Sequence, residues 1–161
     1  MNIKKYENKV IECLNAQQDD IILNSDINHA GILIKQIFLN AVHTVNLLSN
    51  KLDAQLYERV EIINAIRSFL NRGGKLNVAI EGDIDKKSTN MQKLLAEYKI
   101  QPTVVPDWLK KQYEYNFLTM DDTGYRFEGS RGEHKASVNF GDKNQTEKLN
   151  AIFNKIVELV K

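Results

Sequence analysis

Apolar residues recur along this chain at two spacings, which predict helices that alternate with short strands. Steps of three and four residues predict helices over residues 3–17, 28–41, 53–71 and 88–98. Short runs of β-forming residues predict strands over residues 44–49, 75–80 and 103–105. Parallel neighbours need crossovers, and helices supply them. The first two thirds of the chain therefore predict a largely parallel sheet with helices on its faces.

The pattern changes after Trp108. Residues 115–120 and 125–128 flank a turn-forming segment at 121–124, which predicts an antiparallel hairpin. A capping box at residues 144–147 opens a last amphipathic helix. We therefore predict the α/β class: one domain with a mixed, mainly parallel sheet and helices packed on both faces. Residues 1–26 form an N-terminal helix and lead-in, and residues 27–161 form the main domain.

Composition narrows the possible settings without pointing to a partner. The chain has 161 residues, 42% of them hydrophobic, which suffices for one core. Its 22 basic and 21 acidic residues give a formal charge of +1, so any anion site must be local. Cys13 is the single cysteine, which excludes an intrachain disulfide and a thiolate metal cluster. No run approaches membrane-spanning length, and no signal peptide is visible, so we expect a cytoplasmic protein without membrane contact.

The polar residues that could do chemistry are concentrated between Tyr113 and Phe140. This stretch includes the phrases FLTMDDTGYRFEGS and KASVNFGD. Together with TVNLLSNKLD and YERVEIINAIRSFLNRGGKLNVAIEGD earlier in the chain, they resemble the phospholipase D-like superfamily from about Ile27 onward. The resemblance implies a phospholipase D-like domain over residues 27–161.

The resemblance also implies a mechanism and an assembly. Active members carry a motif His-x-Lys-x4-Asp, followed by a phrase like Gly-Ser-x-Asn. Histidine attacks phosphorus, and lysine and asparagine hold the phosphate oxygens, because developing negative charge needs donors. One site needs two copies of the motif, so a chain with one copy is expected to form a symmetric homodimer.

The motif residues of this chain argue against that mechanism. With Asp121 as the motif aspartate, Glu114 stands in place of histidine and Asn116 in place of lysine. A carboxylate repels a phosphate, and asparagine offers neutral donors instead of a fixed charge. Downstream, Ser137 and Asn139 match the second phrase, with alanine in place of its glycine. These residues predict a degenerate member of the superfamily.

A relocated catalytic pair is the alternative. His134 and Lys135 directly precede the segment with Ser137 and Asn139, so both could reach a phosphate held there. Adjacent residues on a strand point to opposite faces, however, and a solvated, charged loop explains them more simply. His29 and His43 fit structural or exposed positions better than catalytic ones.

Other groups of charged residues carry weaker signals. Arg126 and Arg131 lie close to His134 in sequence and could form a local basic patch that binds phosphate, with Tyr125 available for stacking. Turns and helix caps account for the nearby aspartates, so we expect no metal and no cofactor.

Three hypotheses follow. We favour a non-catalytic binding or assembly module that acts as a homodimer and contacts a nucleic acid or a protein. The second is a phosphodiesterase or nuclease that uses His134 and Lys135. The third is an interaction protein whose ancestral cleft has closed. In a homodimer, a His134 side chain that faces His134 of the second copy beside Asn139 would favour the enzyme. Glu114 at the centre of the dimer cleft would disfavour it.

Overall fold

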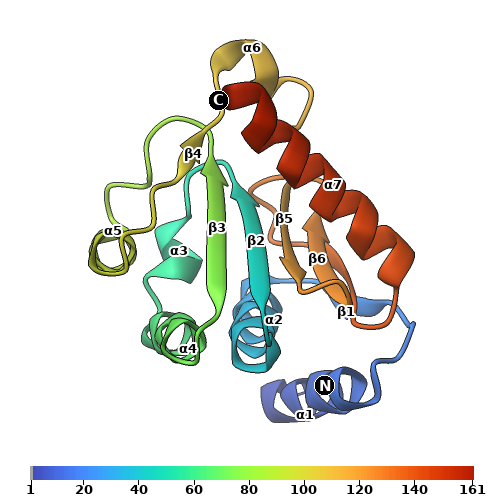
Figure 1. Cartoon of the computed structure of the whole chain (residues 1–161). Helices are drawn as coiled ribbons and strands as arrows, with labels where there is room; N and C mark the ends of the chain where they lie inside the picture. Colours follow the sequence, from blue (N-terminus) through green and yellow to red (C-terminus); the bar gives the residue numbers. More distant parts are fainter. Residues whose placement is uncertain (1) are drawn as a thin grey trace.

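Seven strands form one mixed sheet in the computed structural model, which describes residues 2–161 (Figure 1). Their order across the sheet is β1-β7-β6-β5-β2-β3-β4. The strands are β1 (Ile22–Asn24), β2 (Thr44–Ser49), β3 (Lys75–Ile80), β4 (Thr103–Val104), β5 (Asn116–Met120), β6 (Gly124–Glu128) and β7 (Ala136–Asn139).

The α/β class and the mixed sheet are confirmed, but the balance of strand directions differs from the prediction. Only two neighbouring pairs, β2–β3 and β3–β4, are parallel, and the other four are antiparallel. One reason is that residues 121–123 and 129–135, which join β5 to β6 and β6 to β7, are too few for the crossover that parallel neighbours need. In addition β1, which lies within the predicted lead-in, pairs antiparallel with β7.

The helices cover the two faces of the sheet unequally. They are α1 (Ile3–Ala16), α2 (Ile27–Asn40), α3 (Ala54–Tyr57), α4 (Val60–Asn71), α5 (Thr89–Glu97), α6 (Asp107–Lys110) and α7 (Lys143–Val160). The long α7 crosses one face (Figure 1), where Phe153 and Ile156 belong to a cluster with Phe117. On the other face α2 and α4 bury Ile37 and Ile66 in a larger cluster. Each such side chain contributes about 1.5–3 kcal/mol when fully buried.

The helix predicted over residues 53–71 is in fact two helices. Arg59 has an extended backbone (ψ 131°), so α3 ends before it and α4 begins after it. The break is held by Glu58, whose carboxylate accepts from the backbone N–H of Asn90, and by Arg59 Nε, which donates to the carbonyl of Gln55. The apolar spacing runs through both halves, which is why the pattern gave one helix. Tyr57, two residues before Arg59, is buried.

Within residues 2–161, none of the helices combines the length and the apolar character needed to cross a bilayer.

Candidate functional site

Polar side chains converge at one edge of the sheet, where β2, β3 and β6 end and β5 begins. This follows from the topology, because β5 runs antiparallel to both β2 and β6. A cavity of about 420 Å³ opens there, which we call the Arg126 cavity. Its polar lining includes Asp53, Tyr57, Asn116, Arg126, Glu128 and His134. In open α/β sheets, this is the kind of edge at which ligands bind.

A buried ion pair lies at the floor of the Arg126 cavity. Arg126 and Glu128 are two residues apart on β6 and therefore face the same side, where they are 2% and 4% exposed. Arg126 Nη1 lies 3.5 Å from Glu128 Oε2, and Arg126 Nε donates to Asn24 Oδ1 over 2.9 Å. Arg126 Nη2 is buried and has no protein acceptor among residues 2–161. Because buried donors are nearly always paired, this nitrogen can serve an oxygen of a ligand.

Tyr57 lines the same cavity as Arg126, and the two side chains interact electrostatically. Burial raises the pKa of the Tyr57 phenol, and the positive charge of Arg126 opposes part of that rise. Burial in turn lowers the pKa of Arg126, whereas Tyr57 and Glu128 act in the opposite direction. Since an arginine remains protonated at neutral pH, the floor of the cavity carries the Arg126–Glu128 ion pair next to a neutral phenol.

Arg131 fixes the loop between β6 and β7 to the rest of this edge. Its Nη1 and Nη2 donate to the two carboxylate oxygens of Glu81 over 2.6 and 2.9 Å. Nη2 also donates to the carbonyls of Tyr113 and Tyr115, and Nε donates to Asn116 Oδ1. Every guanidinium nitrogen of Arg131 is thus bonded to protein, so this residue holds the cavity wall together.

His134 faces the cavity, whereas Lys135 is exposed on the same loop. His134 Nε2 lies 3.7 Å from Asp53 Oδ2, and its Nδ1 is buried without a protein partner among residues 2–161. The carbonyl of His134 accepts from Asn24 Nδ2 over 2.7 Å, which anchors the loop to the end of β1. An imidazole therefore does lie in the same cavity as Arg126, but its neighbour Lys135 does not.

The motif positions separate along β5. Asn116 begins the strand at the cavity, and its Oδ1 accepts from the backbone N–H of Asn50 as well as from Arg131. Glu114 is exposed in the segment before β5 and is not part of the cavity lining. Asp121 follows the opposite end of the strand, where its carboxylate accepts from the backbone N–H groups of residues 42–44.

Ser137 and Asn139 are not among the residues that line the Arg126 cavity. Ser137 is exposed on β7. Asn139 is the last residue of that strand, at the end of the sheet opposite the cavity. Asn139 Nδ2 donates to Asp19, and its Oδ1 accepts from the N–H groups of Gly141 and Asp142. The structure thus brings together Asn116, Arg126, Arg131 and His134.

Sequence reasoning missed several residues of this edge. Glu81 directly follows β3, and the ends of parallel strands share one edge, so topology could have indicated it. Tyr57, Glu128 and Asn24 gave no comparable signal, because only the folded chain brings them together. Within residues 2–161, no group of three or more His, Cys, Asp or Glu side chains is placed to hold a metal ion.

Comparison with known proteins identifies the fold. No protein-family model matches the chain, and no curated protein matches it. Nuc from Salmonella typhimurium, a phospholipase D family member, has a TM-score of 0.67 at 11% identity, over 88% of this chain and 96% of its own. NucT from Helicobacter pylori has a TM-score of 0.60 at 14% identity, again over 88% and 96%.

A third similar structure is that of the archaeal chromatin protein TrmBL2, which shows a novel mode of DNA binding. It has a TM-score of 0.62 at 14% identity over 98% of this chain, which spans 62% of the TrmBL2 chain. These likenesses confirm the predicted phospholipase D-like fold.

Proposed function

We propose that this phospholipase D-like chain is a non-catalytic binding module whose Arg126 cavity receives a phosphate group of a nucleic acid. One observation carries the proposal. The cavity holds a buried guanidinium with one unpaired nitrogen, whereas Glu114 and Asn116 stand where the motif of active members has histidine and lysine. The site thus offers donors for an anion without the usual nucleophile.

The contacts of Asn116 and Glu114 support a binding role. Asn116 Oδ1 accepts two hydrogen bonds that fix the cavity wall, and a carboxamide supplies neither a nucleophile nor a fixed charge. Glu114 lies outside the cavity lining, so the position that holds the nucleophile in active members contributes no side chain to this cavity. Both residues therefore fit a site that has lost the family reaction, which makes the chain a degenerate member.

Nucleic acid is the favoured ligand for two reasons. The DNA-binding TrmBL2 has this fold, which supplies a precedent. The second reason is local charge, because exposed Lys51 lines the same cavity as Arg126 and can approach a phosphate backbone. With a net charge of only +1, binding should depend on such local contacts rather than on the whole surface.

The same module is proposed to act as a homodimer. The face of the sheet that α7 crosses continues past the helix, because paired residues on neighbouring strands share one face. Leu23 pairs with Ser137, which pairs with Phe127. Leu23 is 77% exposed there. A second copy that covers this strip would bury it.

A reducing, cytoplasmic setting fits the one cysteine, buried Cys13.

Labelled single- and double-stranded DNA, titrated with the chain over a range of salt concentrations, tests the binding role. We expect binding that weakens with salt, and a Lys51→Met variant with weaker binding and a salt slope reduced by about one. Lys86→Met, which changes an exposed lysine outside the cavity, is the matched control. Absence of DNA binding by the folded wild type would contradict the proposal.

The second candidate is a phosphodiesterase that uses the relocated residues His134 and Lys135. It is favoured by the position of the His134 imidazole, in the same cavity as Arg126 and 3.7 Å from Asp53. Cleavage of a chromogenic phosphodiester or of DNA, with and without chelator, separates the two candidates. Cleavage that is lost in His134→Ala would establish the enzyme, and uncleaved but bound DNA supports the binding module.

Light scattering on a size-exclusion column tests the dimer. We expect the mass of two chains for the wild type and of one chain for Leu23→Asp. Leu159→Asp changes another exposed leucine, on α7, and should leave the dimer intact. A monomeric wild type at micromolar concentration would contradict the dimer and leave the DNA assay as an independent result.

A further inference from the structure

The outer edge of β3 lacks a neighbouring strand over most of its length. All six residues of β3 pair with β2, but β4 pairs only with Ala79 and Ile80. Residues 75–78 therefore have a strand on one side only. An open strand edge is a template for another strand, because its amides and carbonyls already have the right spacing.

The direction of the backbone groups identifies which residues serve this edge. The Lys75 N–H donates to the His43 carbonyl over 2.9 Å and so points toward β2. Successive residues of a strand direct their N–H groups to alternate sides, so the N–H groups of Leu76 and Val78 point to the open side. An added strand would find two amide donors there.

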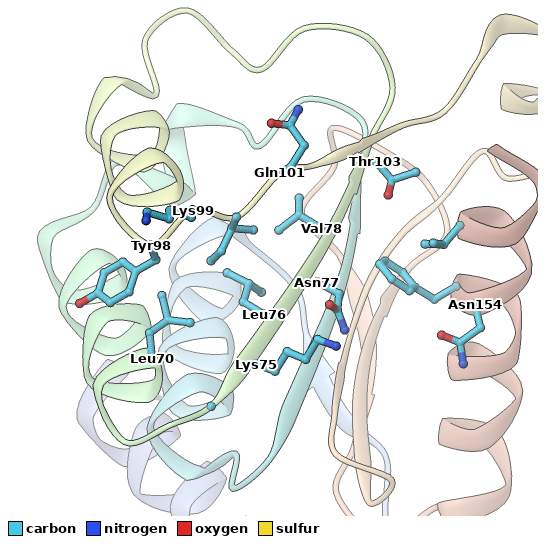
Figure 2. A pocket seen from close by; sticks show the side chains of 14 residues that line it. Leu70, Lys75, Leu76, Asn77, Val78, Tyr98, Lys99, Gln101, Thr103 and Asn154 are labelled. Carbon is cyan, nitrogen blue, oxygen red and sulfur yellow. The ribbon is translucent and has the colours of Figure 1, made fainter. Parts of the chain in front are cut away.

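A groove lies beside this edge, and Figure 2 shows side chains that line it. Its volume is about 590 Å³. One wall includes Leu70 and Tyr98, and the other includes Asn154 and Val157 of α7. In Figure 2, Leu76 and Val78 point to the first side of β3, and Asn77 points toward Asn154. Because side chains of a strand alternate, an added strand would place them alternately against these walls.

The charge of the groove selects the kind of strand. Its lining includes Lys75 and Lys99 and, within the described chain, no aspartate or glutamate. Both lysines are exposed. A second copy of this chain would bring a second Lys75 and Lys99 to the same edge, whereas an acidic segment would pair with them. We propose that the open edge of β3 is a docking site for an extended, acidic segment of a partner protein, which adds to the sheet as a strand.

Selection from a display library of random decapeptides tests this proposal with a defined probe. The wild-type chain is the bait, and the Lys75→Glu/Lys99→Glu variant is the bait for counter-selection. We expect enriched peptides that are acidic and have no proline in their centre, because each proline removes a backbone donor. Binding to the double variant should be at least tenfold weaker. Lys93→Glu, on the exposed side of α5 and outside the groove, should bind like the wild type.

Amide exchange then places the bound peptide. Slower exchange at Leu76 and Val78 in the presence of an enriched peptide is the expected result, and Asn154→Trp, which fills the groove, should abolish it. The proposal is overturned if no acidic peptides are enriched, or if enriched peptides protect other amides. It is also overturned if Leu76 and Val78 are protected by self-association without peptide, since the occupant is then a second copy.

Discussion

Arg126 Nη1 lies 3.5 Å from Glu128 Oε2 beneath the candidate cavity, and neither side chain is more than 5% exposed. Two charges so deeply buried depend on each other, because the loss of one leaves the other without compensation. The ion pair therefore affects both the stability of the sheet and the position of the unpaired Arg126 Nη2. It holds the guanidinium in place while leaving one donor free.

Removal of one partner should be more harmful than removal of both. Glu128→Leu leaves Arg126 charged and unpaired, so we expect the free energy of unfolding to fall by about 3–5 kcal/mol. Arg126→Met/Glu128→Leu replaces both charges and should recover much of that loss. Urea denaturation measures both variants, with exposed Glu133→Leu as control. A double variant less stable than Glu128→Leu would contradict this reading of the pair.

Asp121 should be important for stability, whatever the function of the cavity. Its carboxylate accepts from the N–H groups of Val42, His43 and Thr44 and so joins the start of β2 to the hairpin. Asp121→Ala should lower the free energy of unfolding by at least about 2 kcal/mol, because hydrogen bonds to charged groups are strong. Asp121→Asn keeps one acceptor oxygen, so its free energy of unfolding should lie between those of the wild type and Asp121→Ala.

The adjacent aspartate provides the matched control for this variant. Asp122 is exposed in the same turn. Asp122→Ala should therefore change the free energy of unfolding by no more than about 0.5 kcal/mol. Equal losses for the two alanine variants would show that turn conformation, rather than the three amide bonds, determines the effect.

Alkaline pH should destabilise the chain in part through Tyr57. Its phenol has a pKa of about 10 in the unfolded chain. Burial raises the pKa in the folded chain. The stabilisation is therefore complete below about pH 10 and is lost as pH rises above it, because the unfolded state releases the proton first.

Tyr57→Phe removes this linkage, so its stability should fall less steeply above pH 10 than that of the wild type. Tyr6 is also buried with a raised pKa, so some alkaline sensitivity should remain. Urea midpoints at pH 7, 9 and 10.5 measure the effect, with Tyr113→Phe as the control at a half-buried position. Parallel pH profiles for Tyr57→Phe and the wild type would refute the assignment.

Arg131 should control the order of the loop between β6 and β7. Arg131→Lys keeps the charge but cannot reproduce the paired bonds to Glu81. A loss of about 1.4 kcal/mol would speed local opening tenfold. Hydrogen exchange across residues 129–135 should accelerate accordingly, while exposed Lys135→Met leaves it unchanged. If the amides of Arg131→Lys exchange at the wild-type rate, the positive charge at residue 131 is enough to keep the loop ordered.

The fold was largely predictable because its signals are local. The bounds of β2 and β3 match the prediction, since each is a short apolar run between clear breaks. The break at Arg59 was not predictable, because contacts from Glu58 to a distant helix determine it. Parallel pairing was overestimated because residues 22–24 were not predicted as a strand, and because β5, the antiparallel neighbour of β2, is distant from it in sequence.

The candidate site was predictable only in part. Asn116, Arg126, Arg131 and His134 were candidates that the fold brings to one edge. Ser137 and Asn139 were candidates because of their order in a phrase, but order does not say which end of a strand faces the cavity. The contact between Arg131 and Glu81 spans 50 positions, which no local pattern could indicate.

The pairing of Ile22 with Val138 has a consequence for how the protein is made. Of the seven strands, β1 is synthesised first and its partner β7 last, so β1 is among the last of them to pair. The helices and parallel strands between them can form first from nearer contacts. Until translation passes residue 139, Leu23 and its neighbours in β1 have no partner strand. During this time the nascent chain is most exposed to chaperones and to aggregation.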